Sequence, residues 1–402
     1  MKVLHISAAS EFTGAGKATL LTHEELLNKG IDTKVLFQKS NLKEIGVYSF
    51  HRGNLFLKSR RFIFTSFDRL ILFFYPKRKF FFSPGYFGVG LKKHFLIEWA
   101  DIVHIHWSNQ GFINIREIQS WKKPVVWTLR DMWAFTGGCH QSFSCDRYTM
   151  RCGHCVALGS VSDRDLSRKM LEIKLATYKE LSIKWVAISS WILRQAMNSY
   201  VLGTFKIELI HSGVSSESFK VLDKVSLRAK YGFNNYDKIV LIGAGNLRSE
   251  YKGFQFVKDV LCEVDQNIFV LTFGADTFRA NEVPQVAKHF GFVEGEILIE
   301  LYNLSDFFFA PSVAEAMGKT ILEAQFCGVP VLCFNNTGPA DIVEHMSTGY
   351  LADFKSLEDL KLGFDLLMMN DWDSDYIRKR SIGLFDISLV ADKYINLYQT
   401  LL

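Results

Sequence analysis

The sequence predicts an α/β protein with two domains, each built on a parallel sheet. Short runs of β-branched and other apolar residues alternate with amphipathic segments along most of the 402 residues. Strands that alternate with helices are typical of parallel sheets with helices on both faces. The alternation stops at the polar stretch near residue 214 and restarts near residue 239, and the length alone favours two domains. We therefore expect two Rossmann-like domains, joined at about 212–236.

The expected elements follow in chain order. Runs rich in apolar residues predict strands at 2–6, 33–37, 102–105, 125–129, 184–188, 206–210, 239–242, 268–272, 307–310 and 329–334. Helical spacing of apolar residues predicts helices at 16–28, 165–181, 190–197, 253–263, 319–326, 357–369 and 391–401. We expect an N-terminal domain over 1–214, a C-terminal domain over 215–384, and a helix over 385–402 that packs back toward the N-terminal domain. Ligands of such sheets bind beyond the carboxyl ends of the strands, which predicts a site in a cleft between two facing sheets.

The composition is that of a globular protein, with 48% apolar and 22% charged residues. No uncharged apolar run reaches the roughly 18 residues that a membrane-spanning helix needs. The N-terminus, MKVLHISAAS, carries one lysine and a short apolar stretch, which favours a first strand over a secretion signal. We therefore expect a cytoplasmic protein.

The strongest motif is APSVAEAMGKTILEAQFCGVPVLCF at 310–334. Gly318 lets the backbone approach a ligand closely. The free amides of Lys319, Thr320 and Ile321 at the start of the following helix form an anion site suited to a diphosphate. The carboxylates of Glu315 and Glu323 suit sugar hydroxyls, because each accepts two hydrogen bonds. The alternative is a surface helix with two solvated glutamates, which does not explain why Glu315 lies in a loop right after a buried strand.

This motif also carries a resemblance. Glu-x7-Glu followed by Ala-x3-Gly-x-Pro-Val resembles the signature of the family 4 retaining glycosyltransferases of the GT-B fold. The likeness extends over nearly the whole chain, through TGAG at 13–16, DIVHIHW at 101–107, the junction at 210–219, KGF at 252–254 and LSDFFFAPS at 304–312. It implies that Glu315 faces the transferred sugar and that Glu323 binds the ribose of the nucleotide. It also implies a reaction without divalent metal. The transferases that it resembles most act in the assembly of bacterial capsule, O-antigen and exopolysaccharide.

A second glycine-rich turn, GAGNLRSEYKGF at 243–254, supplies two cations. Arg248 and Lys252 would neutralise the charge that grows on a departing diphosphate. The resembling family places its arginine six residues before the lysine, where this chain has Asn246, and Arg248 is expected to substitute. The turn does not fit G-x-G-x-x-G, and GAGKAT at 14–19 lacks the first glycine of a P-loop because Glu11 occupies that place. A dinucleotide enzyme and an ATPase are therefore not expected.

The N-terminal half offers two further candidate positions. By resemblance, the loop with Gly14 and Gly16 lies over the reaction centre, near the donor phosphates; the alternative is a tight strand–helix turn, which needs glycine equally. His104 and His106 are expected beyond a strand, one side chain on each face of the sheet. The resemblance places His106 near the donor sugar. Relatives carry His-Asp where this chain has Arg130 and an aspartate, so a catalytic role there stays open.

Four cysteines cluster between residues 139 and 155, with two histidines among them. Cys139, Cys145, Cys152 and Cys155 meet the ligand count of a tetrahedral zinc site. Their spacing is not that of a standard zinc finger. Structural zinc that staples a loop, free thiols and a disulfide are the open alternatives.

Residues 52–93 hold ten lysines and arginines and twelve aromatic residues against one acid, Asp68. A basic aromatic surface helix fits an anionic membrane face and a lipid-linked acceptor. No nucleic-acid recognition module accompanies the segment, so nucleic-acid binding is not expected. The alternative is a helix that packs its apolar side chains inward and leaves the basic ones solvated.

Together these features predict a retaining transferase that moves a sugar from a nucleotide-diphosphate donor to a glycan on a polyprenyl-diphosphate carrier. His106, Arg248, Lys252 and Glu315 are the expected catalytic residues, with no catalytic metal. We expect location in the cytoplasm, at the inner face of its membrane. The alternatives are a nucleotide-sugar epimerase of the same fold, a non-catalytic membrane-associated scaffold, and a zinc-dependent nucleic-acid binder.

Overall fold

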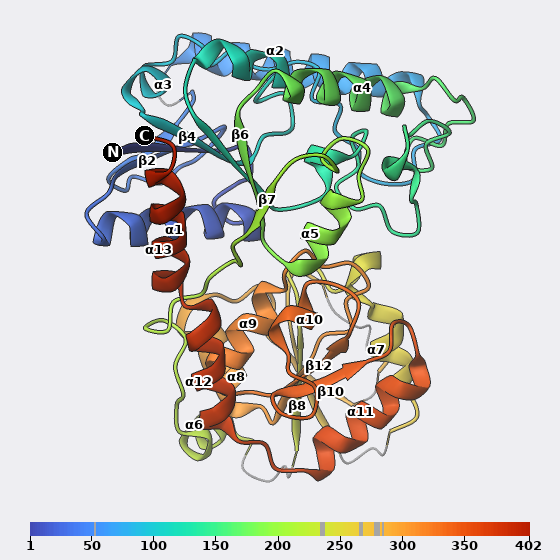
Figure 1. Cartoon of the computed structure of the whole chain (residues 1–402). Coiled ribbons are helices and arrows are strands. Elements are labelled where there is room, and N and C mark those ends of the chain that lie inside the picture. The colour runs from blue at the N-terminus through green and yellow to red at the C-terminus, as the bar shows by residue number, and fades with distance from the viewer. Residues whose placement is uncertain (52–53, 234–237, 265–267, 277–281, 284) are drawn as a thin grey trace. The chain divides into compact units, whose positions relative to one another are not determined.

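The computed structural model describes residues 1–51, 54–233, 238–264, 268–276, 282–283 and 285–402. The first residues of the basic aromatic segment (52–53) and the end of the expected junction (234–236) therefore lie outside the described residues. The chain divides into two compact units (Figure 1): unit 1 is Met1–His211 with Val390–Leu402, and unit 2 is Ser212–Leu389. Each unit contains a parallel sheet, which confirms the predicted α/β class with two Rossmann-like domains.

Over the described residues, unit 1 has a seven-stranded sheet in the order β3-β2-β1-β4-β5-β6-β7. The order reverses between β1 and β4, so the loops that follow these two strands flank the switch point of the sheet. The strands are β1 Lys2–Ser7, β2 Asp32–Phe37, β3 Val47–Ser49, β4 Ile102–Trp107, β5 Val125–Leu129, β6 Ile183–Ala187 and β7 Ile207–Leu209.

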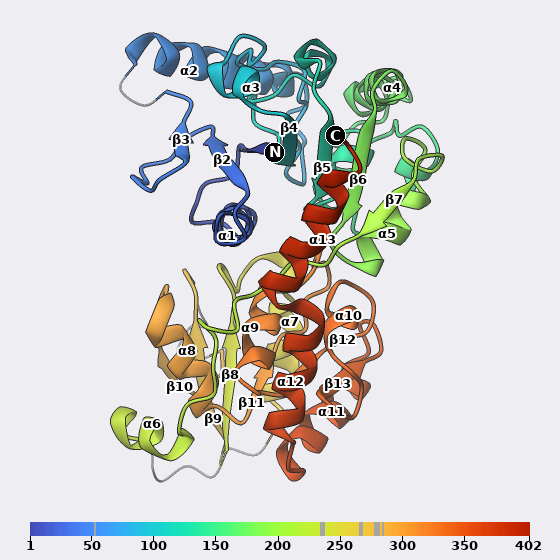
Figure 2. The same cartoon turned by 60° about the vertical axis from the view of Figure 1, so that its left-hand side comes forward.

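The helices of unit 1 begin at polar caps. Side chains of Thr13, Asn54 and Asp165 accept hydrogen bonds from amides of the first turns of α1, α2 and α4. Figures 1 and 2 show α1 and α2 on opposite sides of the sheet. The helices are α1 Gly14–Asn28, α2 Leu55–Leu70, α3 Phe95–Trp99, α4 Leu166–Lys179, α5 Ser190–Met197 and the end of α13 Ile387–Gln399.

Unit 2 has a six-stranded sheet over its described residues, in the order β10-β9-β8-β11-β12-β13. Its switch point lies between β8 and β11. The strands are β8 Ile239–Gly243, β9 Phe269–Phe273, β10 Val286–His289, β11 Phe307–Phe309, β12 Val331–Phe334 and β13 Gly349–Ala352. The helices are α6 Lys224–Tyr231, α7 Phe254–Leu261, α8 Gly295–Leu304, α9 Lys319–Phe326, α10 Pro339–Ile342, α11 Leu357–Met369 and α12 Ser374–Phe385.

The elements that the sequence did not predict are mostly edge strands and short or strongly polar helices. The strands β3, β10 and β13 have three or four residues each, too few for a recognisable run. The segment SDYIRKRSIGLF of α12 buries only Ile377, Ser381 and Phe385. None of the helices in the described part of the chain is long and apolar enough to cross a bilayer.

Candidate functional site

The two loops at the switch point of unit 2 come together. Lys252 lies in a 3₁₀ turn, Glu250–Lys252, after β8, and Glu315 lies in the loop after β11. The Lys252 ammonium donates a hydrogen bond to the Glu315 carboxylate, and the two side chains are 19% and 22% exposed. The contact therefore joins two residues that the sequence placed in separate motifs, and it stays open to a ligand.

Backbone contacts hold these loops in place. The amide of Val313 donates to the carbonyl of Tyr251 over 2.9 Å. Gly253 adopts φ 72°, and a Cβ at this position would lie 1.9 Å from the carbonyl oxygen of Pro311. Only glycine allows the two loops to approach so closely.

The start of α9 supplies amides next to this pair. Gly318 is the N-cap with φ 101° and offers no side-chain cap. Among the described residues the amides of Lys319 and Thr320 have no hydrogen-bond partner, as predicted for an anion site. The amide of Ile321 instead donates to the carbonyl of Gly318 over 3.1 Å, so the expectation that it is free is wrong. A 3₁₀-type bond in the first turn satisfies it.

Glu323 is held rather than solvated. Its side chain is 5% exposed, with one carboxylate oxygen 3.2 Å from the Lys319 ammonium, and its other oxygen accepts from the Tyr302 hydroxyl over 3.1 Å. Burial, followed by the charge of Glu323, raises the pKa of Tyr302 well above its usual range, so this hydroxyl stays a donor. The alternative of a solvated surface glutamate does not apply to Glu323.

Arg248 is engaged elsewhere. Its guanidinium lies 2.5 Å from the Glu282 carboxylate and 3.6 Å from that of Asp276, and it stacks 4.7 Å from the ring centroid of Phe254. A donor phosphate would compete with two carboxylates for this cation. Lys252 is also ion-paired, but with the single carboxylate of Glu315, which lies in the neighbouring loop of the candidate site.

In unit 1 the two histidines of the HIHW motif lie within β4, and both are buried. The expectation that they lie on opposite faces is wrong: their ring centroids are 4.0 Å apart. Residues two apart on a strand share a face, because successive side chains alternate. Both rings therefore belong to one buried polar cluster.

The tautomer of His106 follows from its neighbours. Arg130 has only donors, so its contact of 3.1 Å with Nδ1 of His106 makes that nitrogen the acceptor. The proton of the neutral ring is then on Nε2, which donates to Nδ1 of His5 over 2.8 Å. Burial, then the charges of His104 and Arg130, keep the pKa of His106 well below its usual value. Both ring nitrogens of His106 are thus engaged.

His104 links the sheet to the end of the chain. Its Nδ1 lies 2.6 Å from the hydroxyl of Tyr398, and its Nε2 lies 2.7 Å from that of Thr128. Thr128 in turn lies 2.9 Å from the hydroxyl of Tyr394. Figure 2 shows α13, which carries both tyrosines, beside β5 and β6. In the described part of the chain the nitrogens of His5, His104 and His106 alone form a three-ligand group within 4.8 Å. Within the described residues, five of the six ring nitrogens of these histidines have a polar partner, and the buried Nε2 of His5 has none.

The two glycines of the loop before α1 differ in what constrains them. A Cβ on Gly16 would lie 2.0 Å from the carbonyl oxygen of Ser10, so the fold itself requires this glycine. A Cβ on Gly14 would meet nothing within 4 Å. The alternative of a tight strand–helix turn therefore explains why residue 16 is glycine. Packing gives no reason for glycine at position 14.

The comparison with known families decides the class of the enzyme. Residues 226–382 match the family model described as "Glycosyl transferases group 1". The chain is therefore a glycosyltransferase. The matched stretch lies within unit 2 and holds Lys252 and Glu315, the start of α9, and Glu323.

Known proteins resemble this glycosyltransferase over larger parts of its length. An uncharacterised glycosyltransferase of Methanocaldococcus jannaschii is 23% identical over 62% of this chain and 66% of its own length. WcaC of Escherichia coli K12, named as a glycosyl transferase of colanic acid biosynthesis, is 22% identical over 75% of each chain. The crystal structure of Anabaena HepE in complex with UDP-glucose covers 100% of both chains with a TM-score of 0.69 and 14% identity. The last likeness supports the GT-B fold of this transferase.

The four clustered cysteines of the transferase lie in the loops between β5 and α4. The neighbouring Cys139 thiol is the main cause that lowers the pKa of Cys155 to about 7. Four sulfurs around one zinc would lie about 3.8 Å apart at Zn–S distances of about 2.3 Å. In the described residues no three of these sulfurs lie within 4.8 Å of one another, so they would have to move closer to ligate one ion. Structural zinc stays a prediction, tested by the metal content of the purified protein.

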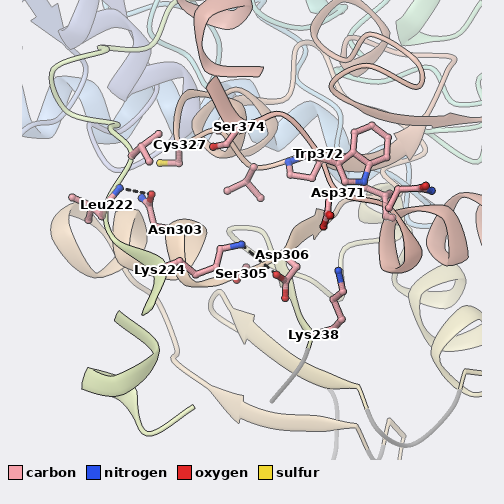
Figure 3. A pocket seen from close by; sticks show the side chains of 16 residues that line it. Leu222, Lys224, Lys238, Asn303, Ser305, Asp306, Cys327, Asp371, Trp372 and Ser374 are labelled. Atoms are coloured by element: carbon pink, nitrogen blue, oxygen red, sulfur yellow. Dashed lines mark hydrogen bonds and ion pairs between the residues drawn. The ribbon is translucent and has the colours of Figure 1, made fainter. Parts of the chain in front are cut away.

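A cavity of about 270 Å³ lies at the amino ends of the central strands of unit 2, opposite the ends that carry the donor-side loops (Figure 3). Its wall includes Lys238, Asp306 and Pro330, which directly precede β8, β11 and β12. Figure 3 shows the ion pair between Lys224 and Asp306 in this wall, over 3.2 Å. Because the donor-side loops follow the carboxyl ends of the strands, this cavity is not the donor site.

Proposed function

We propose that this glycosyltransferase is a retaining enzyme that moves a sugar from a nucleotide-diphosphate donor to a lipid-linked glycan during assembly of a cell-surface polysaccharide. The observation that supports binding of such a donor is the Lys252–Glu315 contact, together with the free amides of Lys319 and Thr320. Two neighbouring loops thus present a cation, a carboxylate and two N–H donors at the switch point, where such sheets bind ligands. The complex of HepE with UDP-glucose and the colanic acid role in the name of WcaC support the donor and pathway classes.

Each group has a role in this proposal. The amides of α9 and the Lys252 ammonium bind the diphosphate and stabilise the negative charge that develops on it as the glycosidic bond breaks. Glu315 accepts hydrogen bonds from hydroxyls of the transferred sugar, and Glu323, oriented by Tyr302, accepts from the ribose. Arg248 would assist only after leaving its carboxylate partners, and His106 would reach the sugar only by exchanging His5 for it. The departing diphosphate takes the proton of the acceptor hydroxyl.

A panel of nucleotide sugars, screened for thermal stabilisation, tests the donor half. We expect one donor to stabilise the protein, by an amount that follows its concentration relative to its Kd. With that donor, NMR of the product is expected to show the anomeric configuration of the donor, and EDTA is expected to leave the rate unchanged. An inverted product would contradict the retaining assignment. Loss of activity in EDTA that Mg²⁺ or Mn²⁺ restores would contradict the metal-independent one.

We also propose that α2 and the residues after it contact an anionic membrane. This surface exposes apolar side chains that a soluble helix would bury, while the one buried residue of α2 is its acid, Asp68. The carboxylate of Asp68 accepts hydrogen bonds from the amides of Gly85, Tyr86 and Phe87. It therefore holds a loop in place inside the unit and does not neutralise the basic side chains on the surface of α2. The exposed apolar side chains are those of Leu55, Phe56, Phe62, Ile63, Phe67, Leu70, Phe73 and Phe74.

Vesicle binding tests this surface. Phe73 and Phe74 are 78% and 84% exposed, and replacing both by serine is expected to weaken binding to vesicles with about 30% anionic lipid by at least about tenfold. Binding of the unaltered protein is expected to fall as salt rises. A matched variant with Val161 and Met197, exposed elsewhere in unit 1, replaced by serine should bind normally. Equal binding by the two variants would contradict the proposal.

A further inference from the structure

A cavity of about 510 Å³ lies at the switch point of unit 1. Its wall is formed by residues that follow the carboxyl ends of the two central strands, Ala8 after β1 and Trp107 at the end of β4. Thr13 and Ala15, at the start of α1, complete one side. This is the position at which open α/β sheets bind ligands, and the volume is that of a site for a small organic molecule.

Two cations line this cavity, and neither has a partner within the described part of the chain. Arg61, from α2, makes no hydrogen bond or ion pair with any residue that the structure describes, and its Nε is buried. Lys39, which follows β2, is exposed and likewise has no ion pair within the described ranges. The one carboxylate of the wall, that of Glu11, already accepts from the amide of Asn41 and the hydroxyl of Ser10. With two cations and one carboxylate, the wall of the cavity carries a net positive charge.

An unpaired, partly buried guanidinium is costly unless a ligand supplies the missing acceptors. A phosphate ester matches it, because the planar fork of arginine binds phosphate oxygens in pairs and a nearby ammonium adds charge. The exposed ring of Phe12 and the indole of Trp107 form apolar walls beside these cations. The set of groups suits an organic phosphate, with apolar or sugar atoms attached, better than a bare anion.

We infer that this cavity binds the phosphate of a prenyl-phosphate-linked acceptor, with Arg61 and Lys39 as the anion-recognising residues. This inference rests on the proposed function and adds to it the cavity and the residues that bind the phosphate of the acceptor. Arg61 lies on α2 next to Phe62 and Ile63, which are exposed on the surface proposed to contact the membrane. One helix thus offers apolar side chains to the lipid and a cation to the phosphate at the head of the same carrier.

Binding of farnesyl diphosphate, measured by calorimetry on the full chain with the donor site saturated by nucleotide, tests the inference. R61Q is expected to weaken binding by at least about tenfold, and R61K is expected to restore part of it. R60Q removes the same charge from the adjacent position, which lines a different cavity, and is expected to change binding less than about twofold. Pyrophosphate should compete with farnesyl diphosphate, and farnesol, which lacks the phosphates, should not bind at this site.

Two results would overturn the inference: R61Q binding farnesyl diphosphate as tightly as R60Q does, or farnesol binding as tightly as the diphosphate. A third concerns the donor. If R61Q also abolishes thermal stabilisation by the nucleotide sugar, the cation serves the donor, and the acceptor assignment is wrong. Failure of the proposed function itself would appear separately, as normal turnover in a Lys252 variant.

Discussion

Lys252→Gln is expected to lower kcat/KM for sugar transfer by about 10²- to 10³-fold, because this ammonium is the cation that the structure offers to the departing diphosphate at the switch point of unit 2. Glutamine removes the charge with a somewhat shorter polar side chain, and the turn, which is held by backbone bonds, stays in place. Release of nucleotide from the donor is the measurement. Most of the effect should appear in kcat, since the charge on the diphosphate grows during the reaction.

Glu315→Gln removes the carboxylate that pairs with Lys252. Lys379→Gln, on the exposed surface of α12, removes the same charge as Lys252→Gln and is its control. We expect Glu315→Gln to lose a similar factor and Lys379→Gln to keep normal turnover. Because Lys252 and Glu315 act on the same bound donor, the double variant should lose much less than the product of the two single losses. Normal rates in both single variants would rule out this pair as the catalytic groups.

Gly253→Ala is expected to reduce both stability and activity. The residue adopts φ 72°, which alanine resists, and the added Cβ would lie 1.9 Å from the carbonyl oxygen of Pro311. Backbone strain of this kind costs about 1–3 kcal/mol in unfolding free energy, and relief of the clash must separate the loops that carry Lys252 and Glu315. Urea unfolding measures the first effect, and nucleotide release measures the second.

Gly245→Ala is the matched control for this variant. Gly245 lies in the same turn, has no left-handed backbone, and a Cβ there would meet nothing within 4 Å. The unfolding free energy of the Gly245→Ala protein is expected to change by less than about 1 kcal/mol in either direction. If the two alanine variants behave alike, the close approach at Gly253 does not control the site.

The parts of this molecule that local pattern determines were predictable from the sequence. The central strands are continuous apolar runs, and the loops with Lys252 and Glu315 stand out as glycine-rich turns beyond such runs. Their contact follows from the topology, because β8 and β11 are neighbours in the sheet. The free amides at the start of α9 follow from Gly318, which offers no side-chain cap.

What the sequence did not predict depends on partners far along the chain. The pairing of Arg248 with Glu282 joins residues whose separation has no local pattern. The hydrogen bond of His104 with Tyr398 spans 294 positions. Arg61 appeared as one of many basic residues in an aromatic segment, and only the fold shows that it lines a cavity. Pattern identifies such residues as polar or basic, whereas their partners are set by tertiary packing.

The hydrogen bonds of Tyr394 and Tyr398 have a consequence for biosynthesis. Ribosomes deliver a protein from its N-terminus, and domains generally fold as units during synthesis. Here the strands β4 and β5 of the first unit receive Tyr398 and Tyr394 from the last stretch of the chain. The nascent first unit must therefore wait, with Thr128 and His104 lacking these hydroxyls, while all of Ser212–Leu389 is translated. The unit that begins first is therefore the one whose hydrogen bonds are completed last.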